Sequence, residues 1–137
     1  QWMMERGFME VKTFRDIING RGQKQKLISV QQEYTVAQTV ELMKKYDIEH
    51  IPVMFELEPL GSISEAGLFQ KVFSNPDIRN AKVESVMEKA YPLVDFNTPV
   101  ERLSTLIHKE NGAVLSKDET GNYHIVTKYD IIQALAK

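Results

Sequence analysis

The chain of 137 residues contains no cysteine. It therefore has no disulfide framework, no thiolate nucleophile and no cysteine-based zinc site. No apolar run approaches the roughly 18 residues that a membrane-spanning helix needs, and the N-terminus lacks a charged-then-apolar signal pattern. We therefore expect a cytoplasmic protein that does not interact with a membrane.

An excess of positive charge is also lacking, because 17 Lys and Arg residues stand against 19 Asp and Glu residues, giving a net charge of -2. Such a chain has no electrostatic field for attracting nucleic acid, so this class of partner is disfavoured. Its composition, 42% hydrophobic and 26% charged, is that of an ordinary globular protein.

Signatures of catalysis and of metal binding are missing as well. The sequence shows no glycine-rich phosphate loop, no Ser/His/Asp order and no paired carboxylates. The pairs Glu49-His50 and His108 with Glu110 have no third ligand, and adjacent strand residues point to opposite faces. We expect neither a catalytic site nor a metal site in this chain.

What the sequence does contain is a repeat. Thr35 and Thr98, Ser64 and Thr127, and Leu68 and Ile131 are each 63 positions apart. This spacing predicts an α/β fold of two similar β-α-β-β-α units stacked face to face. In the first unit we expect strands at 27–30, 50–54 and 61–64 and helices at 35–46 and 65–73. In the second we expect strands at 91–94, 112–115 and 124–127, a helix at 98–108 and a last helix after 127.

Three segments lie outside these units. Residues 1–8 are predicted to form a short amphipathic helix, and residues 14–18 a second one that ends at Asn19-Gly20. The basic run 21–26 is typical of a solvated linker, and residues 77–90 of a connector with a small helix at 83–87. Because the chain opens on Gln1, we expect it to be part of a longer protein.

The corner formed by Thr127 and Asp130 is the candidate binding site. A strand that ends at Thr127 places its hydroxyl beside the free N–H groups of the following helix, where polar and anionic ligand atoms are favoured. Asp130 lies one turn on, and its carboxylate can accept two hydrogen bonds from a vicinal diol such as a ribose. The alternative is purely structural, because Thr-x-x-Asp is also a helix capping box.

Two pairs of segments carry a resemblance to a known family. They are 48–53 (Ile-Glu-His-Ile-Pro-Val) with 61–64 (Gly-Ser-Ile-Ser), and 112–115 (Gly-Ala-Val-Leu) with 125–131 (Ile-Val-Thr-Lys-Tyr-Asp-Ile). Through them, residues 26–137 resemble a tandem pair of cystathionine β-synthase (CBS) domains, also called a Bateman module. The family signature is a glycine, then hydrophobic residues, then Thr or Ser, two variable residues and Asp. Two departures occur, Gly67 in place of the first Asp and Tyr123 in the region of the second glycine.

The resemblance implies that each ligand lies between the Thr/Ser-x-x-Asp corner of one repeat and strand edges of the other. In the first cleft, Asp130 would hold a ribose and Thr127 a polar tail or phosphate. The apolar side chains of Leu27, Ile48 and Ile51 would sandwich a purine. The walls of this cleft would be Lys26, Leu27, Ile28, Ile48, His50 and Ile51.

The second implied cleft pairs Ser64 and Gly67 with Tyr91 and Pro92. Glycine cannot accept hydrogen bonds from a diol, and the tyrosine is large enough to fill part of the space. We therefore expect the second cleft to be empty or weak.

The two ends of the chain carry a narrower resemblance. Residues 2–8 and 126–135 are similar to the regulatory C-terminal region of a bacterial-type cystathionine β-synthase, a pyridoxal-phosphate enzyme of cysteine biosynthesis. This implies that residues 1–25 lead from a missing N-terminal catalytic domain. The domains would then be 26–76 for the first repeat, 77–90 for the connector and 91–137 for the second repeat.

Three functional hypotheses follow, and all treat the chain as non-catalytic and without a cofactor of its own. The first is a homodimeric module in which S-adenosylmethionine controls the attached enzyme. The second is a sensor of AMP, ADP or ATP, with Lys26, His50 and Lys128 as cations for the phosphates. The third is a ligand-free dimerisation module whose corners are only helix caps.

Overall fold

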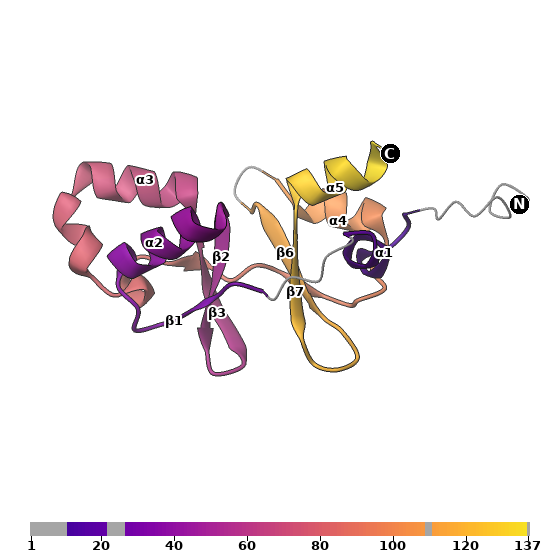
Figure 1. Ribbon diagram of the computed structural model, residues 1–137, viewed down its shortest axis with the longest axis horizontal. Coiled ribbons are helices and arrows are strands. Elements are labelled where there is room, and N and C mark those ends of the chain that lie inside the picture. Colours follow the sequence, from indigo (N-terminus) through magenta and orange to yellow (C-terminus); the bar gives the residue numbers. More distant parts are fainter. Residues whose placement is uncertain (1–10, 22–26, 109–110, 137) are drawn as a thin grey trace, which may run out of the picture. The chain divides into compact units, whose positions relative to one another are not determined.

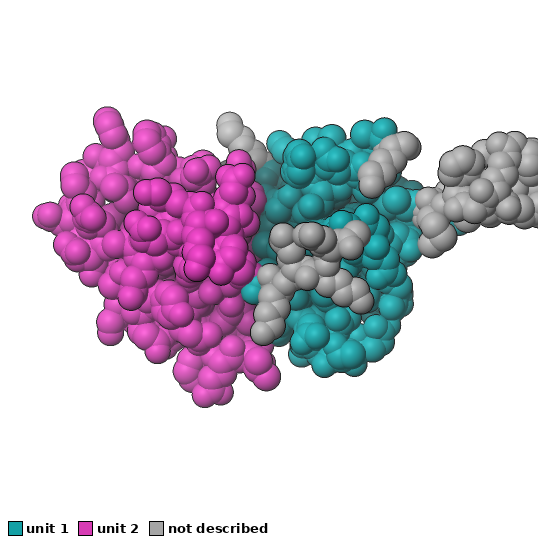
Figure 2. Space-filling model, in the orientation of Figure 1, with its two compact units in different colours: residues 1–27, 92–137 teal, residues 28–91 magenta. Residues whose placement is uncertain are grey.

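The chain divides into two units in the computed structural model, which describes residues 11–21, 27–108 and 111–136. Unit 2 consists of residues 28–91, and unit 1 combines residues 1–27 with residues 92–137 (Figure 2). Each unit has its own sheet and its own apolar core. The mixed α/β class expected from the sequence is confirmed.

Unit 2 is built on a sheet of strand order β1-β2-β3-β4, in which β1 and β2 are parallel and the other pairs antiparallel. Its helices α2 and α3 cover one face of this sheet (Figure 1). Its elements are β1 (Val30–Gln31), α2 (Val36–Tyr46), β2 (His50–Phe55), β3 (Glu58–Ser64), α3 (Glu65–Ser74), the 3-10 turns η2 (Pro76–Asn80) and η3 (Val83–Ser85), and β4 (Glu88–Lys89).

Local sequence determines where the helices of unit 2 begin and end. Helix α2 begins after Thr35, whose side chain accepts from the backbone N–H of Gln38 in a capping box, and it ends at Asp47. Asp47 has a φ of 53°, a left-handed conformation that aspartate tolerates better than most residues. Helix α3 begins directly after β3, with Ser64 as its N-cap.

The core of unit 2 lies between the sheet and its two helices. Val36 and Met43 of α2 and Leu68 of α3 are buried against Ile51, Val53 and Ile63 of the strands. Strand β1 is shorter than expected because only Val30 and Gln31 pair with β2.

The connector adds a strand that the sequence did not predict. β4 pairs with β3 and places Glu88 and Met87 directly against Gly61. A Cβ at Gly61 would lie 2.8 Å from the carbonyl oxygen of Glu88, so a glycine is needed at this close approach. The Ser62 hydroxyl also donates to the Lys89 carbonyl, at 2.6 Å.

Unit 1 has a sheet of strand order β5-β6-β7, covered on one face by three helices (Figure 1). β5 and β6 are parallel, whereas β6 and β7 form an antiparallel hairpin. The elements are α1 (Phe14–Asn19), β5 (Leu93–Val94), α4 (Val100–Leu106), β6 (Ala113–Lys117), β7 (Tyr123–Thr127) and α5 (Lys128–Leu135).

Helix α1 is part of the core of unit 1 although it precedes unit 2 in the chain. Phe14 is fully buried, and its ring centroid lies 5.7 Å from that of Phe96. Its backbone N–H donates to the carbonyl of Thr98 at 2.9 Å. The expected helix at 14–18 is therefore present, but it packs in the same core as Leu103 and Val126.

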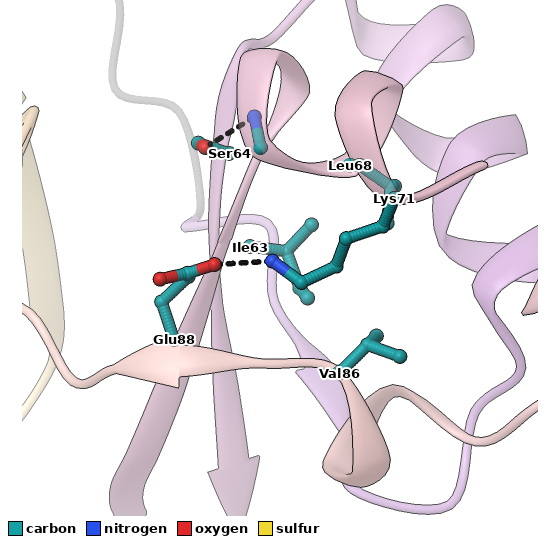
Figure 3. A pocket seen from close by; sticks show the side chains of 7 residues that line it. Ile63, Ser64, Leu68, Lys71, Val86 and Glu88 are labelled. Atoms are coloured by element: carbon teal, nitrogen blue, oxygen red, sulfur yellow. Dashed lines mark hydrogen bonds and ion pairs between the residues drawn. The ribbon is translucent and has the colours of Figure 1, made fainter. Parts of the chain in front are cut away.

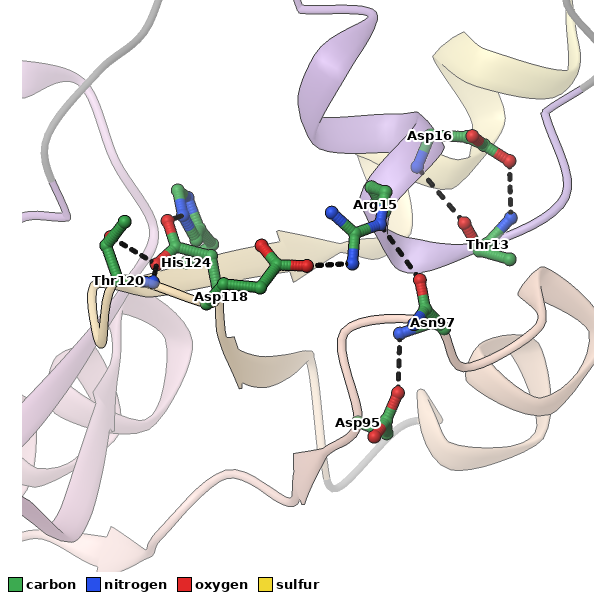
Figure 4. A network of polar contacts seen from close by, with 9 residues as sticks. Thr13, Arg15, Asp16, Asp95, Asn97, Asp118, Thr120 and His124 are labelled. Carbon is green, nitrogen blue, oxygen red and sulfur yellow. Dashed lines mark hydrogen bonds and ion pairs between the residues drawn. The ribbon is translucent and has the colours of Figure 1, made fainter.

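Polar contacts hold the exposed side of α1 as well (Figure 4). The Arg15 guanidinium is paired with Glu119, donates to Asn97 Oδ1 at 2.9 Å and lies 4.8 Å from the centre of the Phe96 ring. Next to Glu119, the Asp118 carboxylate contacts His124 at 2.8 Å, and this bond, with further ones from Thr120 and Asn122, holds the pKa of Asp118 well below its ordinary value.

The 63-residue spacing holds in only part of the structure. Ser64 and Thr127 are both N-caps. Near the start of each repeat the spacing changes, because α2 begins at Val36 and α4 at Val100, which are 64 positions apart. Helix α4 is also shorter than expected, and its N-cap, a proline, makes no side-chain hydrogen bond. The expected helix at 1–8 lies outside the described residues.

Within the described part of the chain, no helix has the length and apolar character needed to cross a bilayer.

Truncation of Phe14 tests whether α1 belongs to the core. We expect Phe14→Ala to lower the free energy of unfolding by about 3–5 kcal/mol, because it removes a buried aromatic ring and leaves a cavity. Urea titration followed by circular dichroism measures this change. The matched control is Phe55→Ala, at a phenylalanine of β2 that is 48% exposed, for which we expect about 1 kcal/mol or less. Equal effects of the two substitutions would contradict the packing of α1.

Candidate functional site

The Thr127–Asp130 corner lies at the junction of β7 and α5 in unit 1. The Asp130 Oδ2 atom accepts from the Thr127 N–H at 2.8 Å and from its hydroxyl at 3.1 Å, while the Asp130 N–H donates back to Thr127 Oγ1 at 3.4 Å. This is a capping box, so the structural role considered from the sequence is present. The Asp130 side chain is 26% exposed and thus within reach of solvent.

A second side chain completes the corner. The Arg21 Nη2 atom lies 3.0 Å from Asp130 Oδ2 and donates to the carbonyl of Ile125 at 2.6 Å. Arg21 follows α1 in the chain, within the run that the sequence indicated as a solvated linker. The structure therefore places one cation of that run at the candidate site. The contact joins residues more than one hundred positions apart, and no local spacing pattern signals it.

The same Thr-x-x-Asp arrangement occurs at the start of α1. The Asp16 Oδ2 atom accepts from the Thr13 N–H at 3.0 Å, and the Asp16 N–H donates to Thr13 Oγ1 at 3.2 Å. Asp16 therefore has the capping role of Asp130 in a different setting. This pair provides a matched reference for separating capping from ligand binding.

The expected walls of the first cleft divide between the two units. Leu27 belongs to unit 1 and is half-buried, whereas Lys26 lies outside the described residues. Ile28 and Ile48 belong to unit 2, where both are half-buried and pack against its core. Ile51 was expected to contact a purine, but its side chain is fully buried in that core. Its register partner across the sheet is Ile63, which is buried in the same core.

His50 and Tyr91, which the sequence assigned to different clefts, contact each other within unit 2. The Tyr91 hydroxyl lies 3.4 Å from His50 Nδ1 and donates to the Ile63 carbonyl at 3.2 Å. His50 is also the register partner of Ser64 on β3. Residues that the sequence assigned to two different clefts therefore lie together at one end of β2 and β3.

Burial determines the protonation of this pair. It lowers the pKa of His50 below its ordinary value, although Glu49 and Glu65 act in the opposite direction. The His50 side chain is therefore neutral near pH 7 and provides no positive charge for a phosphate. Burial also raises the pKa of Tyr91 well above its ordinary value, so its hydroxyl stays protonated.

The Ser64–Gly67 corner differs chemically from the Thr127–Asp130 corner (Figure 3). Ser64 Oγ accepts from the Gly67 N–H at 3.0 Å, but the carboxylate close by belongs to Glu88 of β4, which is paired with Lys71. The hollow that these residues line, together with Ile63 and Val86, is too small to admit a water molecule. The expected cleft also included Tyr91 and Pro92, of which Tyr91 belongs to unit 2 and Pro92 to unit 1.

Unit 2 carries a larger opening elsewhere. A groove of about 530 Å³ runs along α2 and α3. Its apolar lining includes Val40, Met43 and Phe69, and Glu49 and Glu65 are among its acidic residues. This groove was not predicted from the sequence.

Metal ligands do not cluster in the described ranges, where no group of three or more His, Asp or Glu side chains could hold an ion.

Comparison with known proteins agrees with this architecture. Residues 15–74 match the family model of the CBS domain. No curated protein matches the sequence. A CBS-domain-containing protein of Agrobacterium tumefaciens has a TM-score of 0.79 at 15% identity, over 91% of this chain and 94% of that one.

Two further solved structures share the fold. The CBS domain pair of protein MJ0100, in complex with 5′-methylthioadenosine and S-adenosyl-L-methionine, has a TM-score of 0.73 at 17% identity, over 92% of this chain and 97% of that one. A Methanocaldococcus jannaschii protein described as a putative archaeal homolog of γ-AMPK has a TM-score of 0.68 at 15% identity, over 89% of this chain and 53% of that one. The fold of this chain is that of a CBS-domain pair.

Proposed function

We propose that this chain is a regulatory module that binds an adenosyl ligand at the Thr127–Asp130 corner. The observation that carries the proposal is that the Asp130 carboxylate keeps hydrogen-bonding capacity that the described part of the protein does not use. Among the residues that the structure describes, none donates to its Oδ1 atom, and the side chain reaches solvent. A ribose diol is a suitable partner, because its two hydroxyls match the two oxygens of a carboxylate.

The first candidate ligand is S-adenosylmethionine, and 5′-methylthioadenosine shares its adenosyl group. The complex of the MJ0100 pair with both molecules supports this choice by fold analogy. In this proposal the module lies in the cytoplasm and controls an attached pyridoxal-phosphate enzyme of the cystathionine β-synthase type. The ligand changes enzyme activity by binding two arrangements of the module with different affinities.

An adenine nucleotide is the second candidate, and Arg21 is the observation that favours it. Its guanidinium lies next to the corner, where it would attract a phosphate and repel the sulfonium of S-adenosylmethionine. His50 does not contribute to this preference because it is neutral near pH 7.

Isothermal titration calorimetry of Asp130→Ala and Asp16→Ala separates binding from capping. We expect the wild type to bind S-adenosylmethionine or AMP, and Asp130→Ala to weaken that binding about 10-fold to 100-fold, because hydrogen bonds to a charged group are lost. Asp16→Ala removes an equivalent capping carboxylate and should bind as the wild type does. Both variants should lose roughly 0.5–2 kcal/mol of stability.

The ligands and variants together distinguish the hypotheses. A preference for S-adenosylmethionine supports the first candidate, and a preference for AMP or ATP the second. No heat with any of these molecules would contradict ligand binding and leave a dimerisation module as the best account. Equal weakening in Asp16→Ala would show that stability, rather than contact, determines the affinity.

We further propose that the module is a homodimer in which a second copy packs against the groove along α2 and α3. Phe69 and Phe73 of α3 are 65% and 78% exposed, and their rings stack at 6.1 Å. Helix α5 exposes Ile132 and Leu135, which lie 63 positions after Phe69 and Val72. Both repeats therefore present an apolar helix face, and a two-fold interface brings identical patches together.

Substitution in the groove tests the homodimer. We expect Phe69→Glu to convert a dimer into a monomer in size-exclusion chromatography with light scattering, because a buried carboxylate would be left without a partner. The control is Leu57→Glu, at a leucine that is 76% exposed in the β2–β3 turn, which should remain dimeric. A wild-type monomer, or a Phe69→Glu dimer, would contradict this interface.

A further inference from the structure

Arg21 occupies one side of the carboxylate that the proposed function assigns to the ligand. Its Nη2 atom is shared between Asp130 Oδ2, at 3.0 Å, and the carbonyl of Ile125, at 2.6 Å. The Arg21 and Asp130 side chains are 28% and 26% exposed, so the contact is partly shielded from solvent and still within reach of a small molecule. All three residues belong to unit 1.

The contact with Arg21 matters for ligand binding because the Asp130 carboxylate can accept only a limited number of hydrogen bonds. Oδ2 already accepts from the N–H and the hydroxyl of Thr127 in addition to its contact with Arg21. A carboxylate oxygen offers about two lone-pair positions. The two Thr127 donors fill these positions and are fixed by the helix cap. The Arg21 guanidinium forms an ion pair with Oδ2, and it therefore occupies one approach to the carboxylate. Arg21 is the group beside the carboxylate that a ligand can displace.

We propose that Arg21 is a built-in competitor for Asp130, so that a ribose diol binds only as the guanidinium leaves the carboxylate. The inference rests on the proposed function, since it concerns the same corner. It assigns to Arg21 a regulatory contact, and it couples occupancy of the corner to the position of the helix that precedes Arg21 in the chain.

Helix α1 is the element that receives this coupling. Arg21 directly follows the C-cap residue Gly20, and its N–H donates to the carbonyl of Ile18 at 3.3 Å. Two arginines therefore attach this helix to the rest of unit 1. Arg15 binds Glu119 and Asn97 on one side, whereas Arg21 binds Asp130 at the C-terminal end of the helix. Displacement of Arg21 releases that end and leaves the Arg15 contacts in place.

Calorimetry with 5′-methylthioadenosine measures the competition, because this probe has no phosphate or sulfonium to interact with Arg21. We expect Arg21→Gln to bind the probe about 2-fold to 5-fold more tightly than the wild type, the range that loss of a partly exposed ion pair allows. The matched control is Arg15→Gln, which removes the other arginine of this segment and should leave the affinity unchanged. An unchanged or weaker affinity in Arg21→Gln would overturn the competition.

Amide hydrogen exchange tests the contact without any ligand. We expect exchange at residues 17–20 to be at least 2-fold faster in Arg21→Gln and in Asp130→Ala than in the wild type. The double variant should show no further increase, because the two side chains form one contact. Unchanged exchange in Arg21→Gln, or additive increases in the double variant, would overturn the contact itself.

The two readouts distinguish failure of this inference from failure of the proposed function. Binding of the probe with equal affinity to wild type and Arg21→Gln rejects the competitor and keeps the corner as a site. Absence of binding of 5′-methylthioadenosine, AMP and S-adenosylmethionine to both proteins rejects the site, and the competitor with it, whatever the exchange rates show.

Discussion

The Asp130 carboxylate can accept only a limited number of hydrogen bonds, and two parts of the structure already contact it. The start of α5 needs an acceptor for the Thr127 N–H, since the first amides of a helix have no partner within it. Arg21 needs an anion for its guanidinium at the end of α1. Helix capping and the position of α1 therefore depend on the same carboxylate to which the proposed function assigns the ribose diol.

The two corners of the repeated chain differ in their chemistry. At the corner of unit 2, Gly67 provides no carboxylate three residues after the Ser64 cap, and the space beside it is taken by the Lys71–Glu88 pair. Its Ser64 cap satisfies the amide of residue 67 and leaves no group for a diol. The repeat thus keeps the helix cap in both units, but it keeps a carboxylate three residues after the cap only in unit 1.

Much of the fold was predictable because it depends on local patterns. The apolar periodicity of α2 and the short strands β2 and β7 determined their element types, and the Ser64 and Thr127 caps marked where the following helices begin. The packing of α1 into unit 1 was not predictable, since Phe14 contacts Phe96, a residue far away in the sequence. The edge strand β4 was not predicted either, because its two residues are too few to show the alternation typical of a strand.

The candidate site was predictable only in its corner. Thr127 and Asp130 share a local motif, and the motif fixes their geometry through the helix cap. Arg21 lies in a run whose composition is typical of a linker, and its role depends on a long-range pairing that no spacing records. Ile51 was expected to contact a purine, but residues 51–54 of β2 are all buried, so alternation along this strand could not separate a core face from a ligand face.

The most direct test of this account is a two-dimensional NMR titration of the ¹⁵N-labelled chain with 5′-methylthioadenosine. The account predicts that the amide signals of Thr127 and Asp130 and the side-chain Nε–H signal of Arg21 shift together and saturate at one ligand concentration, while the amide of Gly67 does not move. Shifts centred on Ser64 and Gly67, with Thr127, Asp130 and Arg21 unaffected, would contradict the assignment of the site.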